Sequence, residues 1–375
     1  MPPISKAAAM LEAFRHLRQP GQYDRQQKML LEGECRTLSL DEAHELGRLA
    51  VSLLDSDAGK AQDIAEDVLV SLACLVPGAL SGLHQDLVAR EVFYPAEIYL
   101  GADAESRDAL VQRVEWDEAN LDHLLVALAW IGDATVQQQF HSWRDSPPSW
   151  RDKLFIPPEA YARSAGWVLT VEGGRRDLFF QTCYTLVRLP GTENAPTDNP
   201  VAVVSVFPEH CQWCEWEMTT LFDFALGSSR LEFLGLQGER LRVVRCDRCS
   251  LYAVIYMDVD TNGESSWAKE NVEPDFLGGK RDIYPRLPVD RMTLGVKRRS
   301  PYEANWLALE QGHSQIGGHP AWVQDAEYPE CPGCAELMTF IAQLLTYDLY
   351  DYREGTTFAF LCVPCGKTAT VYQQT

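Results

Sequence analysis

The sequence lacks the features that would assign a chain to a membrane, to secretion or to a known catalytic class. It has no apolar stretch of the roughly 18 residues that suggest a membrane span, and its start holds no apolar core of signal-peptide length. It also has no G-x-S-x-G elbow, no phosphate-cradling glycine loop and no H-E-x-x-H motif. We therefore expect a soluble, cytoplasmic protein that is not an enzyme.

Positive charge is scarce. The 375 residues include 33 Lys and Arg against 54 Asp and Glu, a net charge of −21. Residues 1–160 carry 14 basic and 26 acidic groups, and residues 161–375 carry 19 and 28. Both parts would repel a phosphate backbone and attract a basic surface. We expect a protein partner, with no nucleic acid and no membrane; alternatively, the acidic surface serves solubility alone.

The first part of the chain predicts helices. "LDEAHELGRLAVSLL" (40–54) places apolar residues at spacings of three and four, with acids on the other face. "LVSLACLVPGAL" (69–80) and "LVALAWIGDATV" (125–136) align without a gap and have breakers at the same place, Pro-Gly in one and Gly-Asp in the other. Repeated helices of matching pattern are typical of an α-solenoid. We predict a HEAT-like α-helical domain over 1–150; an irregular helical bundle is the alternative.

Four prolines between residues 146 and 160 mark a domain boundary, and the amino-acid composition changes after it. Segments such as "PVAVVSVFPEH" (200–210) are rich in β-branched and aromatic residues and end at Gly or Pro, which indicates strands. The predicted fold class is α+β, with a β-rich domain over 161–375.

Eight of the eleven cysteines form four C-x-x-C pairs, and these pairs repeat. They are Cys211 and Cys214, Cys246 and Cys249, Cys331 and Cys334, and Cys362 and Cys365. "PEHCQWCEWEMTT" and "YPECPGCAELMTF" share Pro-Glu before the cysteines and Met-Thr after them, and both downstream pairs run into an alternating strand. The pattern indicates an internal duplication, with copies at about 201–260 and 315–375.

Cysteines clustered in a reducing compartment indicate metal or redox chemistry rather than disulfides. Tetrahedral Zn²⁺ binds four thiolates, and a C-x-x-C turn presents two of them. In each copy, 31 or 27 residues separate the two pairs, which leaves room for a hairpin and a returning strand. We predict two structural Zn²⁺ ions in closed Cys₄ ribbons. Another metal, an iron–sulfur centre or redox use are the alternatives, and pairing across copies or substitution of a ligand by His210 stays open.

The C-terminal part resembles the YwqG-like bacterial proteins and the related programmed cell death protein 2 group. The shared features are a Gly-Gly-x-Pro-x-Trp element, a C-x-x-C knuckle, and two strands, "MTFIAQL" and "FAFLC", the second of which leads into the second knuckle. The element comprises Gly317, Gly318, Pro320 and Trp322. The resemblance covers about 200–375 and is best over 315–372, and no such element precedes Cys211. It implies a zinc-binding domain with no chemistry of its own.

The whole arrangement resembles bacterial proteins grouped with immunity factors of polymorphic toxin systems. That resemblance implies an immunity protein that binds and occludes a toxin domain. The relatives of programmed cell death protein 2 imply the alternative, a chaperone-like escort of a basic client such as a ribosomal protein. For a contact surface we predict Trp213, which lies between two cysteines of a knuckle and is expected at its exposed tip, and Trp216.

Overall fold

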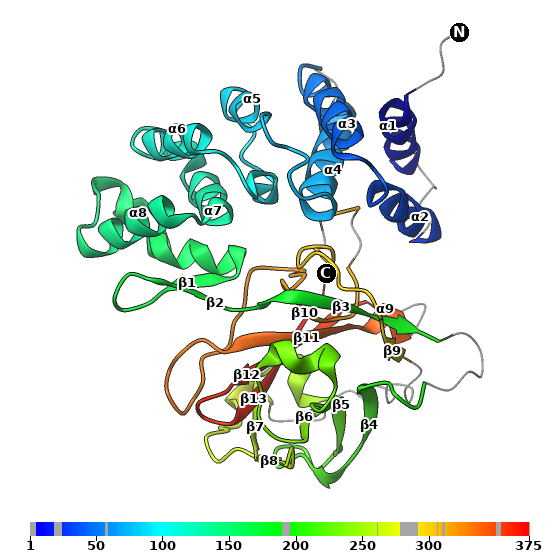
Figure 1. Cartoon of the computed structure of the whole chain (residues 1–375). Coiled ribbons are helices and arrows are strands. Elements are labelled where there is room, and N and C mark those ends of the chain that lie inside the picture. Colours follow the sequence, from blue (N-terminus) through cyan, green and yellow to red (C-terminus); the bar gives the residue numbers. More distant parts are fainter. Residues whose placement is uncertain are drawn as a thin grey trace. The chain divides into compact units, whose positions relative to one another are not determined.

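The computed structural model of the chain is mixed α and β, with helices in its first part and antiparallel sheets in its second (Figure 1). The described residues are 5–18, 25–56, 59–189, 196–260, 262–277, 292–305, 307–309, 312–349 and 354–374. Among them, no helix combines the length and the apolar content that crossing a membrane requires.

The chain divides into two compact units. The helical unit consists of Met1–Asp177 and Asn305–Gln311, and the sheet unit consists of Leu178–Ala304 and Gly312–Thr375. The helical unit therefore includes the proline-rich stretch 146–160 and takes in a short segment from much later in the chain.

The helical unit contains α-helices, short 3₁₀ helices between and after them, and one small β-hairpin. Its α-helices are α1 (Lys6–Leu17), α2 (Arg25–Cys35), α3 (Leu40–Leu53), α4 (Gly59–Leu75), α5 (His84–Ala89), α6 (Ala104–Val114), α7 (Leu121–Ile131) and α8 (Ala134–Asp145). Its 3₁₀ helices are η1 (Ala96–Tyr99), η2 (Glu118–Asn120), η3 (Ser149–Lys153) and η4 (Pro158–Ala165). The hairpin pairs β1 (Trp167–Leu169) with β2 (Arg175–Asp177).

Local sequence explains where these helices begin and end. α3 begins at a capping box, in which the Ser39 hydroxyl accepts from the Glu42 N–H and the Glu42 carboxylate accepts from the Ser39 N–H. α4 ends at Leu75, two residues before its Pro-Gly breaker, and α7 ends at Ile131, directly before Gly132, whose φ of 53° is left-handed. The helix predicted at 40–54 is confirmed, and Ala43, Leu46 and Ala50 of its apolar stripe are buried, whereas Leu40 at its start is 49% exposed.

The sheet unit contains two antiparallel sheets. Its elements are β3 (Phe180–Arg188), β4 (Val201–His210), β5 (Glu217–Ala225), η5 (Ser229–Leu234), β6 (Arg240–Arg245), η6 (Cys249–Leu251), β7 (Ile255–Val259), β8 (Ser265–Trp267), η7 (Asp275–Leu277), β9 (Met292–Leu294), β10 (Gln315–Gly318), β11 (Thr339–Leu345), α9 (Thr346–Leu349), β12 (Thr356–Cys362) and β13 (Lys367–Gln373). Within the described residues, one sheet has the order β8-β7-β13-β12-β11-β10-β3-β9 and the other β4-β5-β6. Their apolar faces share one core, to which β4, β5 and β6 contribute as well as β3 and β9 to β12.

The hairpins β5–β6 and β11–β12 have the same pairing. In each, the threonine of the Met-Thr pair lies opposite the residue directly before the downstream cysteine pair, so Thr219 faces Arg245 and Thr339 faces Leu361. In each, the register shifts after the next residue. The third strands differ, because β13 continues beside β12 whereas β7 leaves β6 and pairs with β13.

Candidate metal centres

The structure brings the eight paired cysteines together as two clusters. The first holds Cys211, Cys214, Cys246 and Cys249, and the second holds Cys331, Cys334, Cys362 and Cys365. In each cluster the four sulfurs lie within 4.8 Å of one another. Each cluster therefore contains cysteines of one predicted copy alone, and the two copies do not exchange cysteines. His210 is exposed and lies outside the first cluster.

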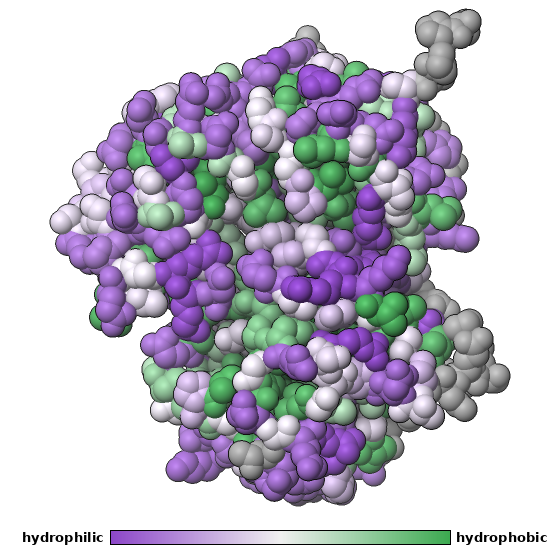
Figure 2. All heavy atoms as spheres, viewed as in Figure 1, coloured by the Kyte–Doolittle hydropathy of each residue, from purple (hydrophilic) through white to green (hydrophobic). Residues whose placement is uncertain are grey.

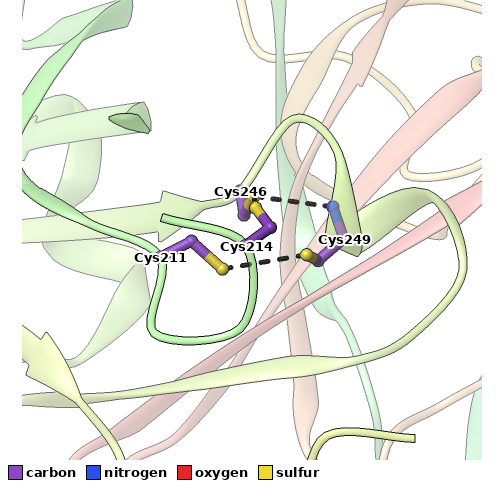
Figure 3. A group of neighbouring side chains, drawn as sticks. All are labelled: Cys211, Cys214, Cys246 and Cys249. Atoms are coloured by element: carbon purple, nitrogen blue, oxygen red, sulfur yellow. Dashed lines mark hydrogen bonds between the residues drawn. The ribbon is translucent and has the colours of Figure 1, made fainter. Parts of the chain in front are cut away.

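Two loops supply the first cluster (Figure 3). Cys211 and Cys214 lie on the turn between β4 and β5, while Cys246 follows β6 and Cys249 begins η6. The Sγ atoms of Cys211 and Cys249 are 3.7 Å apart, and those of Cys214 and Cys246 are 3.5 Å apart. The pairing of β5 with β6 thus holds the two turns at one point.

The spacing of the sulfurs fits a tetrahedral metal ion. Four thiolates at about 2.3 Å from a Zn²⁺ ion have sulfurs separated by roughly 3.8 Å, whereas a disulfide needs about 2.05 Å. The separation of 3.5 to 3.7 Å in the first cluster matches the former, as does the 3.7 Å between Cys334 and Cys362 in the second. None of the eleven cysteines forms a disulfide. Either cluster can therefore hold one metal ion by four sulfurs.

Both upstream knuckles have the same backbone. The Cys211 N–H donates to the carbonyl of Trp216 at 2.9 Å, and the Glu215 N–H donates to the Cys211 carbonyl at 2.8 Å. The same two bonds recur at 2.8 Å around Cys331. Glu215 and Ala335, each directly after the second cysteine, have left-handed φ angles of 57° and 60°. A non-glycine residue there is strained, and such strain is typical of a backbone that a functional site constrains.

The downstream pairs differ, and so does the burial of the two clusters. In the first cluster the last cysteine, Cys249, begins the 3₁₀ helix η6. In the second cluster the last cysteine, Cys365, is followed by Gly366, which has a left-handed φ of 57°. Cys211, Cys246 and Cys249 lie in an apolar cluster, while in the second site Cys334 is exposed. The first metal site is thus part of the core, and the second lies nearer the surface.

A buried ion pair flanks Cys246, and our sequence analysis missed it. The Arg245 guanidinium donates to Asp247 at 2.7 Å, and Asp247 also accepts from the Thr219 hydroxyl at 2.7 Å. Arg245 donates further to the Thr357 hydroxyl on β12. This network fixes the second knuckle to β5 and β12. Opposite charges on both sides of a cysteine in "RCDRC" are the signal that would have indicated it.

The two tryptophans predicted to contact a partner are both half-buried. Trp213 packs edge-to-face on Trp267 with 5.3 Å between ring centroids, so the knuckle tip is not fully exposed. The guanidinium carbon of Arg248 lies 3.5 Å from the ring centroid of Trp216. Each ring offers a partner only part of its surface, and the partner-binding role stays a prediction.

The three remaining cysteines are core residues. Burial raises the pKa of Cys35 and of Cys183 to about 12, and it raises the pKa of Cys74 well above its ordinary value. Their thiols therefore stay protonated at neutral pH, and a protonated thiol is neither a good nucleophile nor a metal ligand.

The Gly-Gly-x-Pro-x-Trp element forms a braced turn after β10. Gly317 and Gly318 have left-handed φ angles of 68° and 74° at a bulge where β10 pairs with β3. The Gln343 side chain donates to the His313 carbonyl at 2.7 Å and accepts from the Ala321 N–H at 2.8 Å. The element is thus a structural turn built into the large sheet.

The fold and its clusters define a mixed α and β protein with two four-cysteine clusters, each of which could hold a metal ion. Over 350 residues, the chain is 37% identical to "Uncharacterized protein YpfL" of Salmonella typhimurium (strain LT2), and the match covers 91% of this chain and 79% of that protein. The chain belongs to the YpfL family. No family model and no solved structure matches the chain.

Proposed function

We propose that this is a non-catalytic, cytoplasmic protein-binding protein, and specifically an immunity protein that neutralises a toxin domain by binding and occluding it. The observation that carries the proposal is that the excess of acidic residues is spread over both units and is not confined to one segment. The helical unit has 17 basic and 29 acidic residues, and the sheet unit has 16 and 25. Hydrophilic side chains cover most of the face shown in Figure 2, and hydrophobic ones gather in small groups. An excess of acidic residues in both units attracts a basic partner.

Zn²⁺ is the metal we assign to both clusters, and we assign it a structural role. All-sulfur donor sets at tetrahedral spacing favour Zn²⁺ or iron–sulfur centres, and Zn²⁺ needs no further inorganic component. Four protein ligands leave no coordination position for water or substrate. The bound ion would join the two cysteine turns of each cluster to one another, which supports a scaffold for binding.

The finer architecture is part of the proposal. Equal register, an equal bulge and equal left-handed residues in β5–β6 and β11–β12 support an origin by duplication. α4 and α7 end at matching residues of the aligned segments, Leu75 and Ile131, which supports a HEAT-like arrangement of the helical unit. The resemblance to the YwqG-like and programmed cell death protein 2 families fits the same picture.

Cross-linking followed by mass spectrometry tests the partner. The tagged full chain, purified from cells that express it naturally, should retain the product of a neighbouring toxin gene. A stoichiometric amount of the chain should abolish the toxin's activity. Raising NaCl from 50 to 500 mM should weaken the complex at least tenfold, because salt screens the attraction. Recovery of ribosomal proteins alone, with no toxin gene nearby, would overturn immunity in favour of escort of a basic client.

A further inference from the structure

The helical unit contains a cavity of about 450 Å³ that the metal centres do not use. Its walls come from the end of α3, the first half of α4, the chain between α5 and η1, and the start of α7. The side chains that matter here are Glu66 and Gln62 on α4, Tyr94 and Phe93 before η1, and His123 on α7. A cavity of this volume is ample for one long side chain.

The charges in the wall cancel except at Glu66. The Arg90 guanidinium donates to both carboxylate oxygens of Asp55 at 3.1 Å. The Glu91 carboxylate pairs with Arg113 at 2.6 Å. Among the described residues, none donates a hydrogen bond to the Glu66 carboxylate or forms an ion pair with it. The lining therefore presents one uncompensated negative charge.

The surroundings of Glu66 favour the arrival of a cation. Burial raises the pKa of this carboxyl, and the carboxylates of Asp63 and Asp67 raise it further. Arg18 opposes them only weakly, since two of its nitrogens are 2.5 Å from the oxygens of Asp67. A carboxylate that is half-buried and surrounded by like charge gains more than an exposed one from a positive partner.

Aromatic rings stand beside this carboxylate. Tyr94 is 52% exposed, and its ring meets that of His123 edge-to-face with 5.9 Å between centroids. Phe93, also in the lining, shows that a guanidinium can pack on a ring here, because the guanidinium of Arg113, from outside the lining, lies 4.9 Å from its ring centroid. A planar guanidinium can pair with a carboxylate and stack on an aromatic face at once, whereas a compact, strongly hydrated ammonium does so less well.

We propose that this cavity binds an arginine side chain of a protein partner, with the guanidinium on Glu66 and stacked on Tyr94. The inference rests on the proposed function in one respect, namely that the arginine belongs to a protein that this chain binds. The neutral amide of Gln62 and the exposed ring of His123 complete the polar mouth of the cavity.

The test measures binding of the peptide acetyl-Gly-Arg-Gly-amide to the full chain by ligand-observed NMR. We expect saturable binding that Glu66→Gln weakens at least tenfold and that Tyr94→Leu also weakens. The matched control is Glu115→Gln, because Glu115 is exposed, lies outside the lining, and its carboxylate makes no hydrogen bond or ion pair among the described residues. That variant should bind as the native chain does. Unchanged thermal unfolding of each variant separates lost binding from lost structure.

Two further ligands make the result specific. The same peptide with citrulline, which is neutral and nearly isosteric, should not bind. Equal binding of the citrulline peptide, absence of saturable binding, or native affinity in Glu66→Gln would overturn the proposal. Tighter binding of free arginine than of the peptide would also overturn it, since the site would then take a metabolite. If the peptide fails while the toxin still co-purifies, only the cavity proposal falls.

Discussion

Replacing Cys246 with serine is expected to release one of two bound metal ions per chain and to prevent cooperative folding of the sheet unit. Cys246 is fully buried, and its knuckle joins β6 to the turn between β4 and β5. In zinc-finger peptides, structural Zn²⁺ contributes about 10–16 kcal/mol at pH 7. That is as large as the ~5–15 kcal/mol by which a whole domain is usually stable. Metal analysis and urea unfolding of the purified variant measure both effects.

Cys183→Ser is the matched control. Cys183 is equally buried in the same unit, and its thiol donates to Gln315 at 3.2 Å, a bond that a serine hydroxyl can replace. We expect this variant to keep both metal ions and to lose no more than about 2 kcal/mol of unfolding free energy. Two metal ions per chain and native unfolding in Cys246→Ser would refute a structural role for the first site.

Gly317→Ala is expected to lower the unfolding free energy of the sheet unit by roughly 3 kcal/mol or more. A Cβ at this position would lie 2.1 Å from the Thr182 carbonyl oxygen, which is backbone of the neighbouring strand β3, and 2.8 Å from the Phe233 ring. The φ of 68° adds strain for any residue with a side chain. Two strands would have to separate, because the nearer obstacle is backbone of β3 and cannot rotate away as a side chain can. Chemical denaturation followed by tryptophan fluorescence measures the change.

Gly227→Ala provides the comparison within the same unit. No atom lies within 4 Å of the Cβ that this substitution would add, and the backbone there is not left-handed. Its unfolding free energy should stay within about 0.5 kcal/mol of the native value. If the two alanine variants were equally stable, the braced turn after β10 would not have the geometry described.

Sequence patterns predicted a helix or strand well where the spacing and type of its apolar residues fitted only one kind of element. The helix expected at 40–54 is α3 (Leu40–Leu53), and the strand expected at 200–210 contains β4 (Val201–His210). The four C-x-x-C pairs predicted two clusters because each pair is a local turn that presents two sulfurs. The choice of partners depends on which hairpins form, and the spacing of the cysteines does not contain that information.

The remaining features depend on contacts between segments distant in sequence. β7 follows β6 along the chain but pairs with β13, more than a hundred residues later, so local pattern predicts the strand and not its neighbour. Trp213 is half-buried, and Trp267 at the end of β8 packs against its ring. Glu66 and Tyr94 meet in one cavity only through the packing of α4 beside the chain before η1. No sequence motif marks any of these three contacts.

Metal analysis of the full-length protein, purified without chelators, tests the central claim most directly. Inductively coupled plasma mass spectrometry should find two zinc ions per chain, and a mercurial that blocks thiols should release both of them. Loss of the ions should be accompanied by loss of structure in the sheet unit, because the binding free energy of a structural metal ion is part of the free energy of folding. Zinc well below one ion per chain, or iron in its place, would contradict two structural zinc sites and return Cys331 and Cys334 to redox chemistry.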